Sequence, residues 1–316
     1  MSHPPGSPAS PAGLTPDVAT FYATHSSFST PGALSALYTD LPPDPARLAR
    51  IARDLMIHRW EGGNYGYDIP PERLHNDAET RNIDDILAVV VERDGAPLTR
   101  PRDLGDRFVG TCRDFALLFC SFLRHRGVPA RVRYGFAGYF GRDGFHHDHL
   151  IGEYWDERRG WCLADPQLTD PVIAGPLGVD FDPVDIPRGR FLDAGTAWRM
   201  IRAGEADPAT FGLGLPDGIM SGESFVAANL LFDIATLNKV EPLVWDVWGA
   251  IADLDHGITE SDRELYDRIA KVTAGEGDFA AARKTYLQED RLRMPRTVLS
   301  LAPFNGPREI TLRELR

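Results

Sequence analysis

The sequence lacks the features of disulfide-rich, membrane-spanning and nucleic-acid-binding proteins. Its three cysteines are too few and too odd in number for a disulfide framework, and no apolar run reaches the ~18 residues of a membrane-spanning helix. Basic residues are outnumbered: 34 Lys and Arg against 46 Asp and Glu leave a formal net charge of −12, which disfavours nucleic acid or an anionic membrane as a partner. The N-terminus has no basic start followed by an apolar run. We therefore expect no signal peptide and a reducing, cytoplasmic location.

The remaining composition is that of an ordinary globular protein. Hydrophobic residues make up 43% and charged residues 25% of 316 residues, enough for a full hydrophobic core. Proline, serine and glycine dominate residues 1–16, which we interpret as a disordered leader. We expect an N-terminal helical segment at 17–84, a central core at 85–195, and a C-terminal helical region with a tail at 196–316.

Apolar residues at helical spacing predict two helices before the central core. The first is amphipathic and covers residues 44–59, with Arg53 on its polar side; the second covers residues 84–92. Between them, the glycines of residues 61–67 predict a loop. This loop is either a plain turn between helices or a mobile lip over an active site.

A third helix begins within Gly110-Thr111-Cys112-Arg113-Asp114-Phe115. Thr111 followed three residues later by Asp114 resembles a capping box with Asp in place of Glu, which places Cys112 at the first helical position. The apolar residues from 115 to 123 form a wide surface, so we expect a deeply packed helix.

Alternating residues after this helix predict an antiparallel sheet. The chain returns through a polar turn, so that three strands are expected, at residues 132–136, 149–154 and 161–165. One helix carrying Cys112, packed on an antiparallel sheet that carries His149 and Asp165, is an α+β fold.

The last third of the chain has a helical pattern. Apolar residues at helical spacing occupy residues 225–237, and Ser261 with Glu264 resembles another capping box. We predict helices over much of residues 196–292, either as a subdomain or as a shell on the core.

Cys112, His149 and Asp165, in this order, suggest a thiol nucleophile, its base and the group that orients the base. The thiolate attacks carbonyl carbon, and both a helix N-terminus and a nearby imidazolium favour the thiolate. His149 would later protonate the departing amine, while Asp165 would fix the imidazole tautomer. The backbone N–H of Cys112, free at a helix start, is a donor for the developing oxyanion.

Each of these residues also has a structural interpretation. A cysteine in an apolar helix is usually a small buried hydrophobe, the role we assign to Cys120, and Asp165 would begin a turn with Pro166. The run His146-His147-Asp148-His149 has metal-ligating residue types but lacks a second spaced pair of ligands. The arginines either meet an anionic group of a substrate or pair with structural carboxylates; the three in question are Arg113, Arg131 and Arg133.

Taken together, the motifs resemble those of bacterial members of the transglutaminase-like superfamily. The resemblance covers roughly residues 85–170 and runs through Gly110–Ala116, Leu123–Arg131, His149 with Glu153, and Trp161 with Asp165-Pro166. It implies a papain-like α+β core with additional N- and C-terminal helices. It also implies Cys112 as nucleophile, His149 as base and acid, and Asp165 as orienter. A thioacyl-enzyme intermediate and no obligatory cofactor follow from the same resemblance.

The triad predicts a cysteine hydrolase or acyltransferase that acts on an acyl carbon of a small molecule or peptide. We expect transfer to water, as in a peptidase or amidase, because water is always available. Three alternatives stay open at this point: amide formation with an amine acceptor, as in a transglutaminase; a biosynthetic acyltransferase that takes its acyl group from a thioester; and a transglutaminase-like binding module without turnover.

Overall fold

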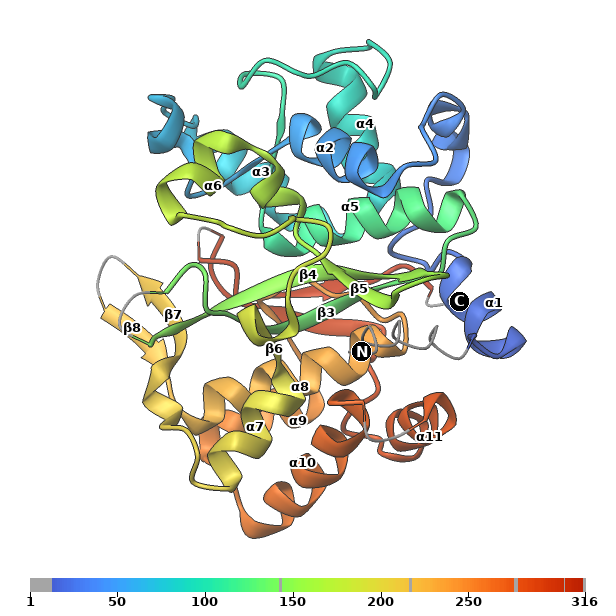
Figure 1. Ribbon diagram of the computed structural model, residues 1–316. Helices are drawn as coiled ribbons and strands as arrows, with labels where there is room; N and C mark the ends of the chain where they lie inside the picture. The colour runs from blue at the N-terminus through green and yellow to red at the C-terminus, as the bar shows by residue number, and fades with distance from the viewer. Residues whose placement is uncertain (1–12, 142–143, 216–217, 276–277, 304, 315–316) are drawn as a thin grey trace, which may run out of the picture.

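A six-stranded sheet lies at the centre of the fold (Figure 1). The computed structural model describes residues 13–141, 144–215, 218–275, 278–303 and 305–314. Residues 1–12 of the predicted disordered leader lie outside the described residues. Among the described residues, no helix combines the length and apolar character needed to cross a bilayer.

Helices and strands alternate along the chain. The helices are α1 (Pro16–Ala23), α2 (Pro45–Leu55), α3 (Pro71–Asn76), α4 (Ile83–Arg93), α5 (Cys112–His125), α6 (Pro171–Leu177), α7 (Ala194–Arg202), α8 (Glu223–Leu237), α9 (Gly249–Asp253), α10 (Glu260–Thr273) and α11 (Phe279–Gln288). The strands are β1 (Met56–His58), β2 (Phe108–Gly110), β3 (Ala130–Ala137), β4 (His146–Asp156), β5 (Gly160–Ala164), β6 (Phe191–Asp193), β7 (Phe211–Leu215), β8 (Gly218–Ser221), β9 (Asp246–Val247), β10 (Thr297–Ser300) and β11 (Arg308–Thr311). The mixed content confirms the predicted α+β class.

Strand β4 is the centre of the main sheet. The strand order is β6-β3-β4-β7-β8. Strand β5 also pairs with β4, along the end of β4 away from its contact with β7. Pairs β3–β4 and β4–β5 are antiparallel, as the alternation predicts, whereas β7 runs parallel to β4 at its start. The predicted turn at residues 156–160 is confirmed by the pairing of Trp155 with Trp161.

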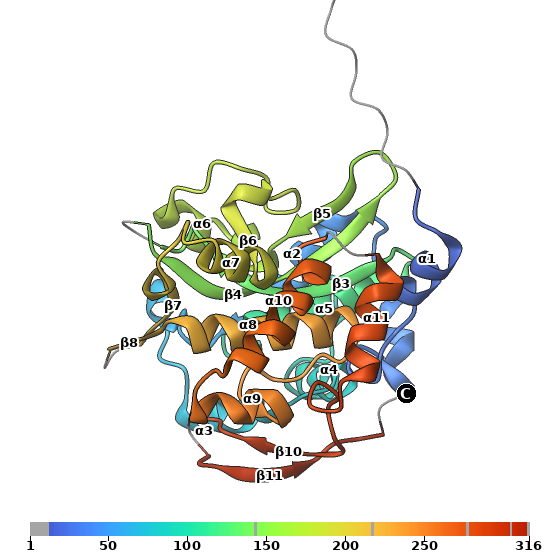
Figure 2. The same cartoon turned by 90° about the horizontal axis from the view of Figure 1, so that it is seen from below.

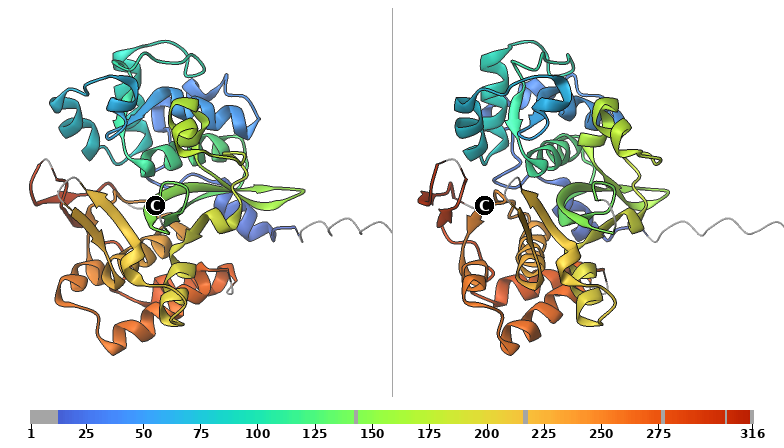
Figure 3. Two further views of the ribbon diagram at one scale, coloured as in Figure 1. Left: turned by 60° about the vertical axis from the view of Figure 1, so that its left-hand side comes forward. Right: turned by 90° about the vertical axis from the view of Figure 1, so that its left-hand side faces the viewer.

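The two faces of the sheet are covered by different parts of the chain. Figure 1 and Figure 3 show helices α2–α5 toward the top of the molecule and α7–α11 toward the bottom, with the strands between them. Figure 2 shows α5 and α8 on the opposite side of β3 and β4 from α6. Residues of β3 such as Val132 and Phe136 share one core cluster with α5 and α8, while Ala137 and Ile151 share a second cluster with α6. Both faces of β4 are therefore buried.

Helix α5 begins and packs as predicted. The Asp114 carboxylate accepts hydrogen bonds from the backbone N–H of Thr111 (2.8 Å) and from its hydroxyl (3.2 Å), which holds Cys112 at the first helical position. The helix lies so close to β4 that a Cβ atom at Gly152 would come within 2.7 Å of the Phe119 ring. Glycine is therefore required at this position of the strand.

The predicted helix over residues 44–59 is too long at its C-terminal end. Helix α2 ends at Leu55, and the next three residues form β1, which pairs in parallel with β2. Arg53, predicted on the polar side, is fully buried, because Glu61 lies 2.6 Å from its guanidinium. Periodicity alone could not detect this strand, because its partner β2 lies about fifty residues away in sequence.

The C-terminal region is helical as predicted, with two differences. The capping box of α10 is Thr259 with Asp262, not Ser261 with Glu264: the Thr259 N–H donates to Asp262 (3.0 Å), whose own N–H donates to the Thr259 hydroxyl (3.2 Å). In addition, β7 and β8 interrupt the helices with a hairpin, and β7 extends the main sheet at His146.

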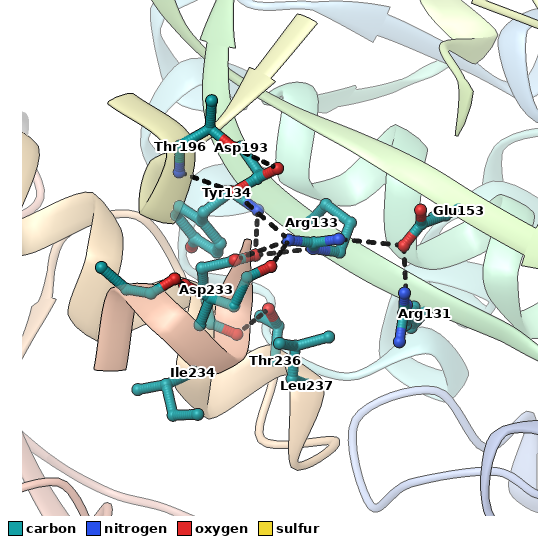
Figure 4. A network of polar contacts seen from close by, with 12 residues as sticks. Arg131, Arg133, Tyr134, Glu153, Asp193, Thr196, Asp233, Ile234, Thr236 and Leu237 are labelled. Atoms are coloured by element: carbon teal, nitrogen blue, oxygen red, sulfur yellow. Dashed lines mark hydrogen bonds and ion pairs between the residues drawn. The ribbon is translucent and has the colours of Figure 1, made fainter. Parts of the chain in front are cut away.

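The buried carboxylate of Glu153 contacts three arginines, of which Figure 4 shows Arg131 and Arg133. Its carboxylate lies 2.7 Å from Arg131, 3.0 Å from Arg133 and 2.9 Å from Arg188. Burial alone would raise the pKa of Glu153, but these guanidinium groups outweigh it and lower the pKa well below its ordinary value. Arg131 and Arg133 are thus structural partners of a buried carboxylate.

Asp233 of α8 extends this network to the C-terminal helices (Figure 4). It lies 2.9 Å from Arg133, and it accepts a hydrogen bond from the backbone N–H of Tyr134 (3.0 Å). Because β6 pairs with β3 only from Gly135 onward, Asp233 occupies an edge of β3 that no strand covers. The network therefore fixes α8 to the central sheet.

We expect Glu153→Gln to lower the free energy of unfolding by about 3–5 kcal/mol, because it leaves buried arginines without their shared partner. Urea unfolding followed by circular dichroism would measure the loss. Asp180→Asn is the control, because Asp180 is 72% exposed where it pairs with Arg190, and it should cost less than about 1 kcal/mol. Equal, small losses in both variants would contradict a stabilising role of the network.

Candidate active site

The three residues predicted to carry the chemistry come together at one end of α5. Cys112 is the first residue of α5, His149 lies on β4, and Asp165 directly follows β5. The Nε2 atom of His149 lies 2.7 Å from Oδ2 of Asp165. The Cys112 thiol interacts with the same imidazole and favours its charged form, with a higher pKa. His149 therefore lies between the thiol and the carboxylate.

Asp165 is held from several sides. Its backbone N–H donates to the carbonyl of Pro183 (2.8 Å), and its Oδ1 accepts from the backbone N–H of Gln167 (3.0 Å). Oδ2 accepts a hydrogen bond from the Tyr139 hydroxyl (2.9 Å) in addition to its contact with His149. Asp165 thus starts the turn at Pro166, as its structural interpretation predicts, and it also orients the imidazole.

The environment of His149 favours its charged form. The side chain is buried and its ring packs edge-on against Phe140, with ring centroids 4.8 Å apart. Burial alone would lower the pKa of His149, but the Asp165 carboxylate and the Cys112 thiol outweigh it and raise the pKa to about 10. At neutral pH the ring is an imidazolium.

Cys112 differs from the other two cysteines in exposure. It is partly exposed, whereas Cys120 and Cys162 are buried. Burial raises the pKa of the Cys120 thiol to about 12 and that of Cys162 to about 11, so both stay protonated. The prediction that Cys120 is a small buried hydrophobe is confirmed by its position in the main core. Of the three cysteines, Cys112 alone is partly exposed to solvent.

His58 is a site residue that the sequence analysis missed. It is buried on β1, where it pairs with Gly110 two residues before Cys112. Its Nδ1 atom accepts a hydrogen bond from the backbone N–H of Trp60 (3.3 Å). Burial and the charges of neighbouring groups, His149 first among them, lower the pKa of His58 to about 3. The ring is neutral, with its proton on Nε2.

The loop at residues 61–67 is anchored by polar contacts. Glu61 accepts a hydrogen bond from the side chain of Gln167 (3.0 Å), two residues after Asp165. The Tyr65 hydroxyl donates to Asp170 (2.8 Å) in the same segment. These contacts favour a structured turn over a mobile lip, and the turn braces the segment that holds Asp165.

The histidine cluster on β4 does not form a metal site. Side chains alternate along a strand, so His147 and His149 lie on one face and His146 and Asp148 on the other. His146 stacks on Phe211, with ring centroids 4.9 Å apart. Within the described ranges, no three His, Cys, Asp or Glu side chains gather in a way that could hold a metal ion.

Arg113 is a structural residue. It is fully buried, its guanidinium lies 2.8 Å from Asp114, and it donates to the backbone carbonyls of Arg81 (2.7 Å) and Glu241. The alternative of an anionic substrate group at Arg113 therefore has no support.

Comparison with known proteins identifies the core. Residues 89–166 match the family model of the transglutaminase-like superfamily, a segment that contains Cys112, His149 and Asp165. None of the curated proteins matches this chain. Among solved structures, red sea bream transglutaminase is similar at 17% identity and a TM-score of 0.29, over 81% of this chain and 38% of that chain. Residues 89–166 thus form a transglutaminase-like domain. The whole chain spans well under half the length of the red sea bream enzyme.

We expect Asp165→Asn to lower the pKa of His149 from about 10, because the carboxylate that raises it is lost while burial of the ring stays. A titration of the histidine ring signals by NMR would measure it. Asp185→Asn is the control, because Asp185 pairs with the exposed Arg159 far from the imidazole.

The same shift affects stability. A pKa that is raised on folding adds stability that is fully present below pH 6.5 and is lost as the pH rises through about 10. Asp165→Asn should remove this contribution, so its free energy of unfolding should fall less than that of the wild type between pH 7 and 10. A His149 that titrates alike in both proteins would contradict the assignment.

Proposed function

We propose that this chain is a cysteine-dependent acyl-transfer enzyme that hydrolyses an amide. The observation that carries the proposal is the placement of His149 between the partly exposed Cys112 thiol and the buried Asp165 carboxylate. The match of residues 89–166 to the transglutaminase-like superfamily supports it. A small molecule or a peptide would supply the acyl group.

The first half of the reaction forms a thioacyl-enzyme. The Cys112 thiolate attacks the carbonyl carbon, and the carbonyl oxygen becomes an oxyanion. The His149 imidazolium then gives its proton to the amide nitrogen, the carbon–nitrogen bond breaks, and the amine leaves. Asp165 holds the ring in one orientation and stabilises its charge before this transfer.

The second half of the reaction releases the acyl group to water. Neutral His149 takes a proton from a water molecule, whose oxygen attacks the thioester carbon. The carbon–sulfur bond then breaks, which gives a carboxylic acid and regenerates the thiolate beside the imidazolium. An amine in place of water would give an amide instead, so hydrolysis and transfer share one intermediate.

Two N–H groups are suited to the oxyanion. One is the backbone N–H of Cys112, the first residue of α5, a position where a helix provides no carbonyl partner of its own. We assign the second to Nε2–H of His58, because this ring is neutral, its tautomer is set by Trp60, and its strand pairs with the residues leading into Cys112. A neutral imidazole can donate to an oxyanion without taking part in proton transfer.

The proposal predicts that iodoacetamide labels Cys112 selectively. At pH 6–7 we expect labelling of Cys112 before Cys120 and Cys162, whose thiols are buried and protonated. Peptide mapping by mass spectrometry would locate the adduct, and Cys112→Ala is the control. A catalytic role of Cys112 would be contradicted if Cys112 is labelled slowly at pH 6–7 and reacts only when unfolding exposes all three thiols.

The same protein distinguishes the kinds of acyl donor. Intact-mass measurement after mixing with p-nitrophenyl acetate, a peptide amide library or a simple thioester would reveal an acyl group on Cys112. Acylation by amides supports the peptidase or amidase interpretation, and acylation by thioesters alone supports a biosynthetic acyltransferase. No acylation by any donor supports a binding module without turnover.

We expect His58→Leu to lower kcat about a hundredfold to a thousandfold with little change in KM, because an oxyanion donor acts in the transition state. His58→Gln should lose less, since its amide keeps an N–H donor. The pH profile should keep its shape in both variants, because His58 is already neutral. A shifted pH profile would show instead that His58 takes part in proton transfer.

A further inference from the structure

The Asp165 carboxylate binds more than the imidazole of His149. Its Oδ2 atom lies 2.7 Å from Nε2 of His149 and also accepts a hydrogen bond from the hydroxyl of Tyr139 (2.9 Å). Asp165 is 1% exposed and Tyr139 6% exposed, so these contacts are shielded from bulk water, where hydrogen bonds are electrostatically weaker. An imidazole and a phenol therefore share one buried carboxylate oxygen.

The ring of Tyr139 is held by packing. Tyr139 lies two residues after the end of β3 and is part of the second core cluster. Its ring packs against Phe140 and Phe181, with ring centroids 4.9 Å and 5.5 Å away. These contacts do not involve the hydroxyl, so removal of the hydroxyl alone should leave the ring in place.

The hydroxyl of Tyr139 is the donor in its contact with Asp165. Burial and the Asp165 carboxylate raise the pKa of Tyr139 well above its ordinary value, so the phenol keeps its proton at neutral pH. An ionised carboxylate only accepts hydrogen bonds, and a bond to a charged acceptor is about twice as strong as a neutral one. The phenol thus stabilises part of the negative charge that would otherwise act on His149 alone.

We propose that Tyr139 is a positioning residue: by sharing Oδ2 of Asp165, it limits how strongly this carboxylate holds the proton of His149. The backbone N–H of Gln167 donates to Oδ1 (3.0 Å), and the N–H of Asp165 donates to the carbonyl of Pro183 (2.8 Å). These bonds keep the orientation of Asp165 without the hydroxyl, so the hydroxyl acts on the strength of the contact with His149. The inference rests on the proposed function, because it concerns the proton that His149 gives to the amine and takes from water.

The shared oxygen matters most in the second half of the reaction. His149 has to be neutral there to take a proton from water, and a carboxylate that holds the imidazolium too strongly slows this step. Cys112 is acylated at that stage, so its thiolate no longer favours the charged ring, whereas Asp165 still does. A donor that weakens Asp165 therefore speeds the release of the acyl group.

Two changes at residue 139 test the proposal in opposite directions. Tyr139→Phe removes the donor, whereas 3-fluorotyrosine at residue 139 strengthens it, because the fluorinated phenol is more acidic. The titratable groups around His149 that both changes leave in place are Cys112 from α5, His58 from β1, Asp165 after β5, and His147 and Asp148 on its own strand.

The first measurement is an NMR titration of the His149 ring signals. Cys112 is blocked with iodoacetamide, because the thioacyl-enzyme also has no thiolate at this position. We expect the pKa of His149 to be about 0.5–1 pH units higher in Tyr139→Phe than in the wild type, since part of a hydrogen bond to a charged group is transmitted to the ring. In the fluorinated protein it should be lower than in the wild type.

The second measurement is the pH profile of deacylation. Cys112 is acetylated with p-nitrophenyl acetate, and loss of the acetyl group to water is followed by intact-mass measurement. Below the pKa of His149, deacylation should be about threefold to tenfold slower in Tyr139→Phe, with the full rate recovered at higher pH, and faster in the fluorinated protein. A structural role alone would lower the rate at every pH and leave the profile in place.

Tyr22→Phe is the matched control. Tyr22 is 2% exposed, and its hydroxyl donates to the backbone carbonyl of Leu237 (2.8 Å), so this variant also loses a buried hydrogen bond of a tyrosine. Its acceptor is not the carboxylate that binds His149. Tyr22→Phe should therefore change neither the pKa of His149 nor the pH profile.

The outcomes separate this inference from the proposed function. A His149 pKa and a pH profile like those of the wild type in both altered proteins would overturn the inference, and so would shifts in the opposite directions. If Tyr139→Phe does not fold, the fluorinated protein decides alone. Failure of p-nitrophenyl acetate to acetylate wild-type Cys112 would instead contradict the proposed function, while the NMR titration would still test the link between Tyr139 and His149.

Discussion

The burial of both faces of β4 is the constraint on which the rest of the structure depends. The strand pairs with β3, β5 and β7 and is covered by α5 and α8 on one face and by the segment around α6 on the other. Polar side chains on the buried middle of the strand therefore need partners inside the protein. Glu153 meets arginines, and His149 meets Asp165. The candidate active site is one solution to this general requirement.

Three carboxylates on or near the sheet show how partners decide protonation. Glu153 contacts guanidinium groups, and its pKa is lowered in spite of burial. Asp233 contacts the same Arg133. Burial raises the pKa of Asp233 more than Arg133 lowers it, so the net shift is upward. Asp148 has no guanidinium partner, and burial raises its pKa to about 6.

The transglutaminase-like segment does not build the site alone. Residues 89–166 supply Cys112, His149 and Asp165, but His58, which pairs with Gly110, comes from β1 in the N-terminal part of the chain. The segment at Pro183 fixes the backbone of Asp165. The matched core thus carries Cys112, His149 and Asp165, while segments outside it, at His58 and Pro183, hold the backbone around them.

The sequence by itself determined what depends on near neighbours in the chain. The cap formed by Thr111 and Asp114, the apolar face of α5 and the alternation of β3 to β5 are local patterns, and together they indicated Cys112, His149 and Asp165. Tertiary structure alone decided the rest. The strand at His58, the burial of Arg53 and the stacking of Phe232 on Tyr134 depend on segments about fifty to a hundred and twenty residues apart. Such contacts arise from packing, which leaves no periodicity in the sequence of either partner.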